Sequence, residues 1–195
     1  MKKIMMIAAM MVAVLSANAQ NEVGQVTLQP KVGMTIATIT GSGDQKAKVG
    51  LAAGVEAEFG VAENFSITAG ALYSMEGCKY NDVKFNFDYI DVPVLAQYYL
   101  AKGFAAKAGV QFGFNVRHKA SYDGNSVDIN DFYKALGYDT KVQSFNMSIP
   151  VGLSYEYESF VLDARYNIGL SKILKNTDEG RGSVFMITVG YKFAL

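Results

Sequence analysis

Hydrophobic and polar residues alternate along most of this chain with a period of two. The clearest run is FAAKAGVQFGFNVR, in which aromatic and aliphatic side chains alternate with Lys, Gly, Gln, Asn and Arg. Successive side chains of a β-strand point to opposite faces, so this period predicts an extended strand with two unlike faces. The pattern recurs and predicts eight strands, at about residues 30–38, 49–60, 65–76, 84–100, 104–117, 145–157, 160–171 and 183–195.

The alternation changes parity within the predicted strand 84–100. Three aromatic residues near its start have the opposite parity to three aliphatic residues that follow them; these are Phe85, Phe87 and Tyr89, then Ile90, Val92 and Val94. A change of parity indicates either a β-bulge at this point or a strand that continues beyond the patterned zone. The sequence leaves both interpretations open.

The connections between the predicted strands alternate in length. Short links, VAEN, AKG and a few residues around Ser159, follow the second, fourth and sixth strands. Longer links follow the first, third, fifth and seventh strands: ITGSGDQKAK, GCKYNDVK, residues 118–144 and KILKNTDEGRG. Short turns at one end and long loops at the other are typical of a bacterial outer-membrane barrel. An even number of strands places both termini at the short-turn, periplasmic end.

Two barrels have such alternating strands: a soluble lipocalin-like barrel with an apolar interior, and a membrane barrel with an apolar exterior. The glycines favour the membrane barrel. Eight strands leave an interior just wide enough for side chains, so small residues belong on the crowded inner face. The glycines that share the polar parity are Gly33, Gly54, Gly70, Gly109, Gly113, Gly152, Gly169 and Gly190.

Aromatic and charged residues favour the same choice. Seven aromatic residues of the apolar parity fall at the short-turn end, as in the aromatic girdle of a membrane interface; these are Phe59, Phe65, Tyr98, Phe104, Tyr157, Phe160 and Phe193. No charged residue interrupts the apolar parity of strands 104–117 and 160–171. The sequence therefore predicts an all-β fold: an eight-stranded antiparallel transmembrane β-barrel of the small outer-membrane-protein type.

The N-terminus, MKKIMMIAAMMVAVLSANAQ, has the three parts of a secretory signal peptide. Lys2 and Lys3 precede a short apolar stretch, and Ala17-Asn18-Ala19 is a small-x-small cleavage site. We expect residues 1–19 to be the signal peptide and residues 20–195 to be the barrel domain, which is located in the bacterial outer membrane. No later stretch is long and apolar enough for a membrane helix.

The inward parity of the predicted barrel carries equal numbers of cations and anions. The cations are Lys31, Lys107, Arg117, Arg165 and Lys192, and the anions are Glu56, Glu58, Asp91, Glu156 and Asp163. We expect them to pair, because an unpaired buried charge is costly. Open aqueous channels need about sixteen strands, so the sequence predicts a plugged lumen that does not conduct.

The chain resembles the small outer-membrane β-barrel family of Bacteroidota, often called porin-family or PorT-like proteins. The resemblance rests on LQPKVGMTIA, YIDVPVLAQYYL, AKAGVQFGF and ITVGYKFAL, and on the Gln after the cleavage site. The C-terminus resembles the β-signal read by the barrel-assembly machinery, with Thr188, Gly190, Phe193 and Leu195 at the matching positions. It ends in Ala194-Leu195 where many such proteins end in Phe. The resemblance implies the fold and location and leaves the activity open.

Few residues are candidates for chemistry. His118 is the only histidine, and Ser121 and Asp123 follow it, but three residues of one polar loop do not show a triad. DGNSVDIND, residues 123–131, is acidic and fails the calcium-loop pattern at Val127. NDFYKALG predicts a short helix with Asn130 or Asp131 as its N-cap and Gly137 beyond its end. Cys78 is the only cysteine and is expected to be a loop thiol without a role.

We therefore expect no catalytic, cofactor or metal site, and a non-enzymatic barrel whose extracellular loops serve structural, adhesion or partner-binding roles. The expected partners are outer-membrane lipid, the barrel-assembly machinery during biogenesis, and a protein at the extracellular loops of a monomer. The formal net charge of zero does not suggest a nucleic-acid-binding protein, which would have a basic patch or stripe, so no nucleic-acid partner is expected. The alternatives are a lipid-modifying hydrolase or acyltransferase at the mouth near His118, and an accessory component of a type IX secretion system.

Overall fold

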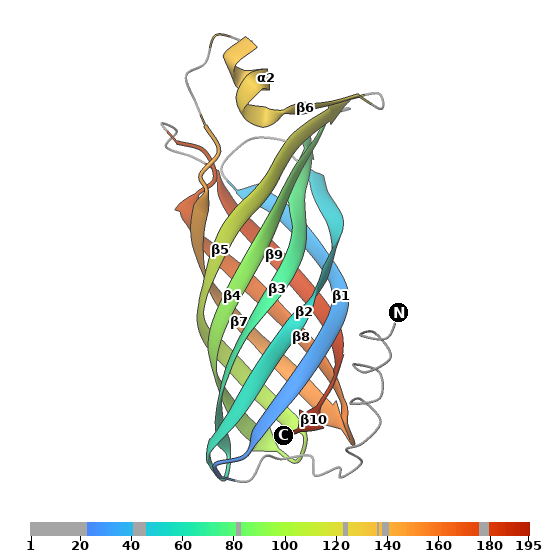
Figure 1. The fold of residues 1–195 in the computed structure, drawn as a ribbon, viewed down its shortest axis with the longest axis vertical. Helices are drawn as coiled ribbons and strands as arrows, with labels where there is room; N and C mark the ends of the chain where they lie inside the picture. The colour runs from blue at the N-terminus through green and yellow to red at the C-terminus, as the bar shows by residue number, and fades with distance from the viewer. Residues whose placement is uncertain are drawn as a thin grey trace, which may run out of the picture.

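The computed structural model of the chain describes residues 23–40, 46–80, 83–122, 125–135, 137, 141–175 and 180–195. The predicted signal peptide lies outside these residues. One antiparallel sheet of tilted strands closes on itself to form a barrel (Figure 1). Its long strands are β1 (Val26–Thr40), β2 (Lys46–Ala62), β3 (Phe65–Tyr80), β4 (Val83–Ala101), β5 (Phe104–Tyr122), β7 (Phe145–Tyr157), β8 (Phe160–Lys172) and β9 (Arg181–Tyr191).

Pairing between the first and last long strands closes the barrel. Each long strand pairs with the next one along the chain, and β9 pairs with β1 from Lys31↔Gly190 to Thr40↔Arg181. A short strand, β10 (Phe193–Ala194), pairs with the start of β1. The predicted eight-stranded antiparallel barrel is therefore confirmed. Within the described residues, no helix has the length and hydropathy that a membrane span requires.

The two faces of the barrel wall are divided as the sequence predicts. Large apolar side chains such as Leu153, Leu162 and Val189 are exposed on the outer face. Neighbours in the same strands, such as Asp163 and Thr188, are buried in the lumen. The apolar face therefore meets lipid and the polar face fills the interior, which excludes the lipocalin-like arrangement.

Glycines make room for the long charged side chains of the lumen. Gly152 lies opposite Lys107 on one side and opposite Arg165 on the other. A Cβ atom at Gly152 would lie 2.5 Å from the Ala164 carbonyl oxygen and 2.8 Å from Arg165 Cα, so no larger residue fits there. Other such neighbours are Gly54 and Gly190 beside Lys31, Gly70 beside Glu56 and Gly113 beside Asp91.

The periplasmic end has two-residue turns and an aromatic girdle. Residues 63–64, 102–103 and 158–159 join the strands there, with Gly103 (φ 74°) and Glu158 (φ 54°) in the left-handed region. Aromatic rings meet on the outer wall at this end: the Phe160 and Tyr191 centroids are 5.2 Å apart, and those of Tyr191 and Phe193 are 4.6 Å apart. The predicted girdle is therefore present.

At the extracellular end the strands continue further than predicted. β3 and β4 pair without interruption from Leu72↔Asp91 to Tyr80↔Val83, which leaves only residues 81–82 between them. The prediction of a longer loop at GCKYNDVK was therefore wrong. The alternation of apolar and polar residues stops where the strand leaves the lipid zone. Strand pairing depends on backbone hydrogen bonds, so it continues beyond that point.

A β-bulge lies in β5. Asp88 pairs with Arg117 and Tyr89 pairs with Asn115, which leaves Val116 as the extra residue. β4 itself has no extra residue here and continues beyond the patterned zone, which was one of the two interpretations of its parity change. Its three aromatic residues near the start, Phe85, Phe87 and Tyr89, lie on the inward side at the extracellular end.

Two short elements stand above the extracellular rim (Figure 1). β6 (Asn125–Asp128), which the sequence did not predict, pairs with the end of β5. α2 (Ile129–Ala135) confirms the predicted helix, and Gly137 (φ 81°) follows its end. Its predicted N-cap was wrong, because Asp128 Oδ1 accepts the hydrogen bond from the Asn130 backbone N–H at 2.8 Å. The cap comes from the last residue of β6, whose position is set by pairing with β5.

Candidate functional site

The middle of the lumen is filled by an ion-pair network centred on Arg165. The Arg165 guanidinium donates to Asp163 Oδ1 through Nε at 2.8 Å and lies 2.8 Å from Glu56 Oε1 through Nη1. Lys31 Nζ donates to Glu56 Oε2 at 2.7 Å, and Lys107 Nζ donates to Asp163 Oδ2 at 2.7 Å. All five side chains are buried. The network connects β1, β2, β5 and β8 across the interior.

A second network closes the lumen toward the periplasm. Lys192 Nζ lies 2.6 Å from Glu156 Oε2 and 2.9 Å from Glu58 Oε2. Tyr99 Oη donates to Glu58 Oε1 at 2.7 Å, and Gln97 Nε2 donates to the same oxygen at 3.2 Å. Together the two networks pair four of the predicted inward cations with four of the predicted inward anions. The predicted pairing of inward charges is therefore confirmed for these eight residues.

Arg117 does not belong to this plug, and its predicted inward orientation was wrong. Its side chain is 53% exposed, and its Nη1 lies 3.5 Å from Asp88 Oδ2. The same carboxylate oxygen accepts a hydrogen bond from Tyr73 Oη at 2.7 Å, and Tyr73 is on the outer wall. The bulge at Val116 reverses the parity of the residues that follow it, so Arg117 faces outward.

Asp91 is inside the barrel as predicted but has a different kind of partner. Its Oδ2 accepts a hydrogen bond from Ser74 Oγ at 2.5 Å, and Ser74 Oγ also lies 3.3 Å from Glu76 Oε1. Within the described part of the chain, no cation forms an ion pair with Asp91. Arg117, the predicted inward cation that neither network contains, lies on the outer side of the wall.

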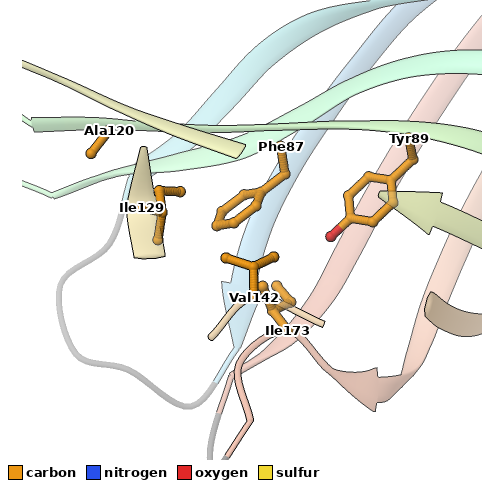
Figure 2. Close-up of a cluster of buried hydrophobic side chains, with 6 residues drawn as sticks. All are labelled: Phe87, Tyr89, Ala120, Ile129, Val142 and Ile173. Carbon is orange, nitrogen blue, oxygen red and sulfur yellow. The ribbon is translucent and has the colours of Figure 1, made fainter. Parts of the chain in front are cut away.

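An apolar cap covers the lumen at the extracellular end. The cap consists of Phe87, Tyr89, Ala120, Ile129, Val142 and Ile173, all buried, which come from β4, β5, α2 and two loops. Figure 2 shows the Phe87 ring beside Ile129 and above Val142, with Ile173 next to Val142. An apolar cluster that excludes water has the character of a small soluble core. It lies at the extracellular end, between the barrel wall and the segments above the rim.

Backbone pairing holds the two loops of the cap together. Val142 and Leu174 form an antiparallel bridge, and the Gln143 N–H donates to the Ile173 carbonyl at 2.8 Å. Tyr133 of α2 packs against the cap, and burial raises the pKa of its phenol. The sequence did not predict the cap, although apolar residues such as Val142 within otherwise polar loops were a usable signal.

His118 fastens α2 to the barrel. Asn130 Nδ2 donates to His118 Nε2 at 2.9 Å, and His118 Nδ1 donates to Asn115 Oδ1 at 2.7 Å. Asn130 Oδ1 in turn accepts from the Val142 N–H at 2.9 Å, and Asp128 Oδ2 lies 3.3 Å from His118 Nε2. Both ring nitrogens therefore have partners within the cap, and His118 acts as a structural tie between β5, α2 and the loop at Val142.

The structure does not bring His118 together with Ser121. His118 lies on the inward side of β5, opposite Phe87, whereas Ser121 lies opposite Lys84 on the outward side. Ser121 Oγ is 2.9 Å from Ser126 Oγ. Asp123, the third residue of the proposed hydrolase site, lies outside the described residues. The pairing of a base with a nucleophile that a hydrolase requires is therefore missing at these two positions.

The other candidate residues have structural positions. Cys78 was predicted in a loop but lies in β3, where it is 1% exposed. In the acidic segment, Asp128 caps α2 and Asp131 is exposed on the helix. Among the residues that the structure describes, no group of three or more His, Cys, Asp or Glu side chains could hold a metal ion.

A closed eight-stranded wall with an apolar exterior, an aromatic girdle and a plugged lumen defines a small outer-membrane β-barrel protein. Residues 18–175 match the family model described as "Outer membrane protein beta-barrel domain", and the chain belongs to this family. The protein is accordingly located in the bacterial outer membrane. No curated protein matches the chain.

Solved structures of small outer-membrane barrels are similar in fold. Ail, the attachment invasion locus protein of Yersinia pestis, is 15% identical with a TM-score of 0.52, over 88% of this chain and 100% of that chain. Neisserial surface protein A is 14% identical with a TM-score of 0.54, over 91% of this chain and 99% of that chain. Ail has also been solved in complex with the heparin analogue sucrose octasulfate. At these identities the likeness shows the fold alone.

Replacement of Arg165 by Met is expected to destabilise the barrel strongly. The substitution leaves the buried carboxylates of Glu56 and Asp163 with fewer cations, and breaking a buried ion pair costs about 3–5 kcal/mol. Urea unfolding of the refolded protein in lipid vesicles measures the change. Lys102→Met, at an exposed position of a periplasmic turn, is the matched control, and equal stability of the two variants would contradict the network's structural role.

Replacement of His118 by Phe is expected to loosen the cap while the barrel remains folded. The variant loses the hydrogen bonds to Asn115 and Asn130, at about 1 kcal/mol each, so local opening should become roughly 30-fold more frequent. Limited proteolysis of the protein in detergent, followed by mass spectrometry, reports cleavage near α2. Asp131→Asn, an exposed position of α2, should be cut as slowly as the unmodified protein; unchanged cleavage of His118→Phe would refute the tie.

Proposed function

We propose that this protein is a non-conducting, non-enzymatic barrel that presents a folded extracellular surface for attachment or partner binding. The observation that carries this proposal is the apolar cap at the extracellular end, together with the buried ion pairs that occupy the lumen. We infer that the two layers together leave no path for solutes. The lipid-facing wall is covered by the membrane, which leaves the extracellular surface for specific recognition.

The tip formed by β5 and β6 has the properties of a contact surface. Tyr122 and Val127 are 60% and 48% exposed there, beyond the apolar cap. The β5–β6 pairing, including Tyr122↔Asn125, holds the tip on the end of a barrel strand. Exposed tyrosines on a rigid support bury a large area at low entropic cost when a partner binds. The tip therefore supports a binding role better than a purely structural one.

The similarity to Ail supports the same proposal. Ail is the attachment invasion locus protein, and it shares this fold over its whole length. We propose a role in attachment for this chain as well. The identity of 15% shows only a common fold. We also propose, from the sequence marks given above, that the chain is a PorT-like barrel of Bacteroidota that is exported by a cleaved signal peptide, inserted by the barrel-assembly machinery and monomeric.

Planar-bilayer recording tests the closed lumen. The refolded protein is expected to give no stable conductance steps, because the lumen of an eight-stranded barrel is filled by its own side chains. An open sixteen-stranded porin at the same protein-to-lipid ratio is the positive control. Reproducible steps of porin size from the refolded protein would overturn the non-conducting proposal.

Site-specific photo-crosslinking tests the contact surface. A photoreactive phenylalanine at Tyr122 is expected to form discrete protein adducts on intact cells. The same group at Tyr157, which is 64% exposed in the periplasmic girdle, is expected to label lipid alone. Cells that produce Tyr122→Ser/Val127→Ser should also adhere less than cells with the unmodified protein at equal surface level. Adducts at neither position, together with unchanged adherence, would refute the attachment role.

A further inference from the structure

Like charges are placed side by side in one row across three strands at the extracellular end. Lys46 of β2 lies opposite Lys79 of β3, and Lys79 lies opposite Lys84 of β4. All three residues are exposed. Like charges directly opposite each other destabilise a sheet. The row of lysines therefore lowers the stability of the folded barrel unless an anion is bound beside it.

The row continues the lipid-facing side of the wall. Tyr73 and Ile90 face outward, and the uninterrupted pairing of β3 with β4 keeps Lys79 and Lys84 on the same side. On β5, Lys119 lies opposite Asn86, diagonally from Lys84. The bulge places Arg117 outward below Lys119. We call Lys79, Lys84, Arg117 and Lys119 the outer basic patch.

Few acidic side chains pair with the outer basic patch in the described part of the chain. Within the described residues, no ion pair joins Lys79, Lys84 or Lys119 to an acidic side chain, whereas Arg117 has Asp88. Asn86 Nδ2 donates to the backbone carbonyls of Lys84 at 3.5 Å and Lys119 at 3.4 Å, and to Ser121 Oγ at 3.3 Å, so it leaves the lysine side chains unbound. These three lysines are exposed, and no acidic side chain in the described part of the chain neutralises them.

At the periplasmic end, the exposed anions of the turns outnumber the exposed cations. The exposed charges of the two-residue periplasmic turns are Glu63, Lys102 and Glu158, two anions and one cation. A positive outer wall at the extracellular end alone points to an anion that is present at that interface. Basic clusters beside a membrane are attracted to anionic headgroups.

We propose that the outer basic patch binds the phosphate groups of outer-leaflet lipid headgroups. The lipid's acyl chains would lie against the apolar wall that contains Ile90 and Val116, which places its headgroup at the level of Arg117 and Lys119. Phosphate between Lys79 and Lys84 would neutralise the repulsion that the register creates. This site is on the outer wall and is independent of the contact surface at the β5–β6 tip.

The test uses the mature protein refolded into nanodiscs that contain either bisphosphorylated lipid A or the same lipid A after removal of its phosphates. The variant is Lys79→Gln/Lys84→Gln/Lys119→Gln; Arg117 is kept because Asp88 depends on it. Lys102→Gln/Lys134→Gln/Lys141→Gln removes the same charge at exposed positions elsewhere. Native mass spectrometry measures retained lipid, and circular dichroism measures thermal unfolding.

The unmodified protein and the control variant are expected to retain the phosphorylated lipid, and the patch variant to bind it roughly 100-fold more weakly, from about fivefold for each lysine. In zwitterionic detergent the patch variant should be at least as thermally stable as the unmodified protein, because the repulsion is relieved. Weaker lipid retention together with undiminished thermal stability in detergent would show that the variant has lost binding and has kept its fold.

Three results would overturn the proposal: equal retention by the two variants, equal retention of the dephosphorylated lipid, or stabilisation of the unmodified protein in detergent by inorganic phosphate to the same extent as by lipid. The last result would assign the patch to a free anion. If the triple variant does not fold, Lys84→Gln alone, at the centre of the patch, carries the same comparison with an expected fivefold loss.

Discussion

The structure depends on one constraint: in a bilayer, every backbone N–H and C=O group must find its hydrogen-bond partner within the protein. The β1–β9 pairing meets this constraint by removing both edges of the sheet. Closure with eight strands also sets the width of the interior, which is just enough for side chains. The polar face of every strand is thereby forced into a narrow space, and the remaining features of the barrel are consequences of filling it.

Ion pairs and small residues together allow the polar side chains to fill the lumen. Arg165, Glu56 and Asp163 are buried and tolerated because each charge has an opposite charge within hydrogen-bond distance. Their bulk is accommodated because glycines such as Gly152 occupy the adjacent register positions. The network also joins strands that are far apart in the sequence, from β1 and β2 to β5 and β8.

The two ends of the barrel follow different physics. At the periplasmic end, two-residue turns complete the sheet close to the membrane. At the extracellular end, where water is available, the chain adds an apolar cap that is stabilised as a soluble core is, with Phe87 and Ile129 at its centre and His118 tying α2 to β5. The outer wall at this end is basic. In our proposals, extracellular recognition and contact with lipid headgroups would use separate surfaces of this end.

The sequence by itself determined the eight strands, the side of the wall that meets lipid and most of the charged plug, because a period of two is a local property of the backbone and lipid allows only one assignment of the two faces. Only the tertiary structure decided the rest. One extra residue, Val116, moved Arg117 to the outer wall. The capping of α2 by Asp128, the burial of Cys78 and the cap itself depend on which segments pair above the membrane. No local pattern contains that information, because pairing partners distant in the sequence are brought together only when the barrel closes.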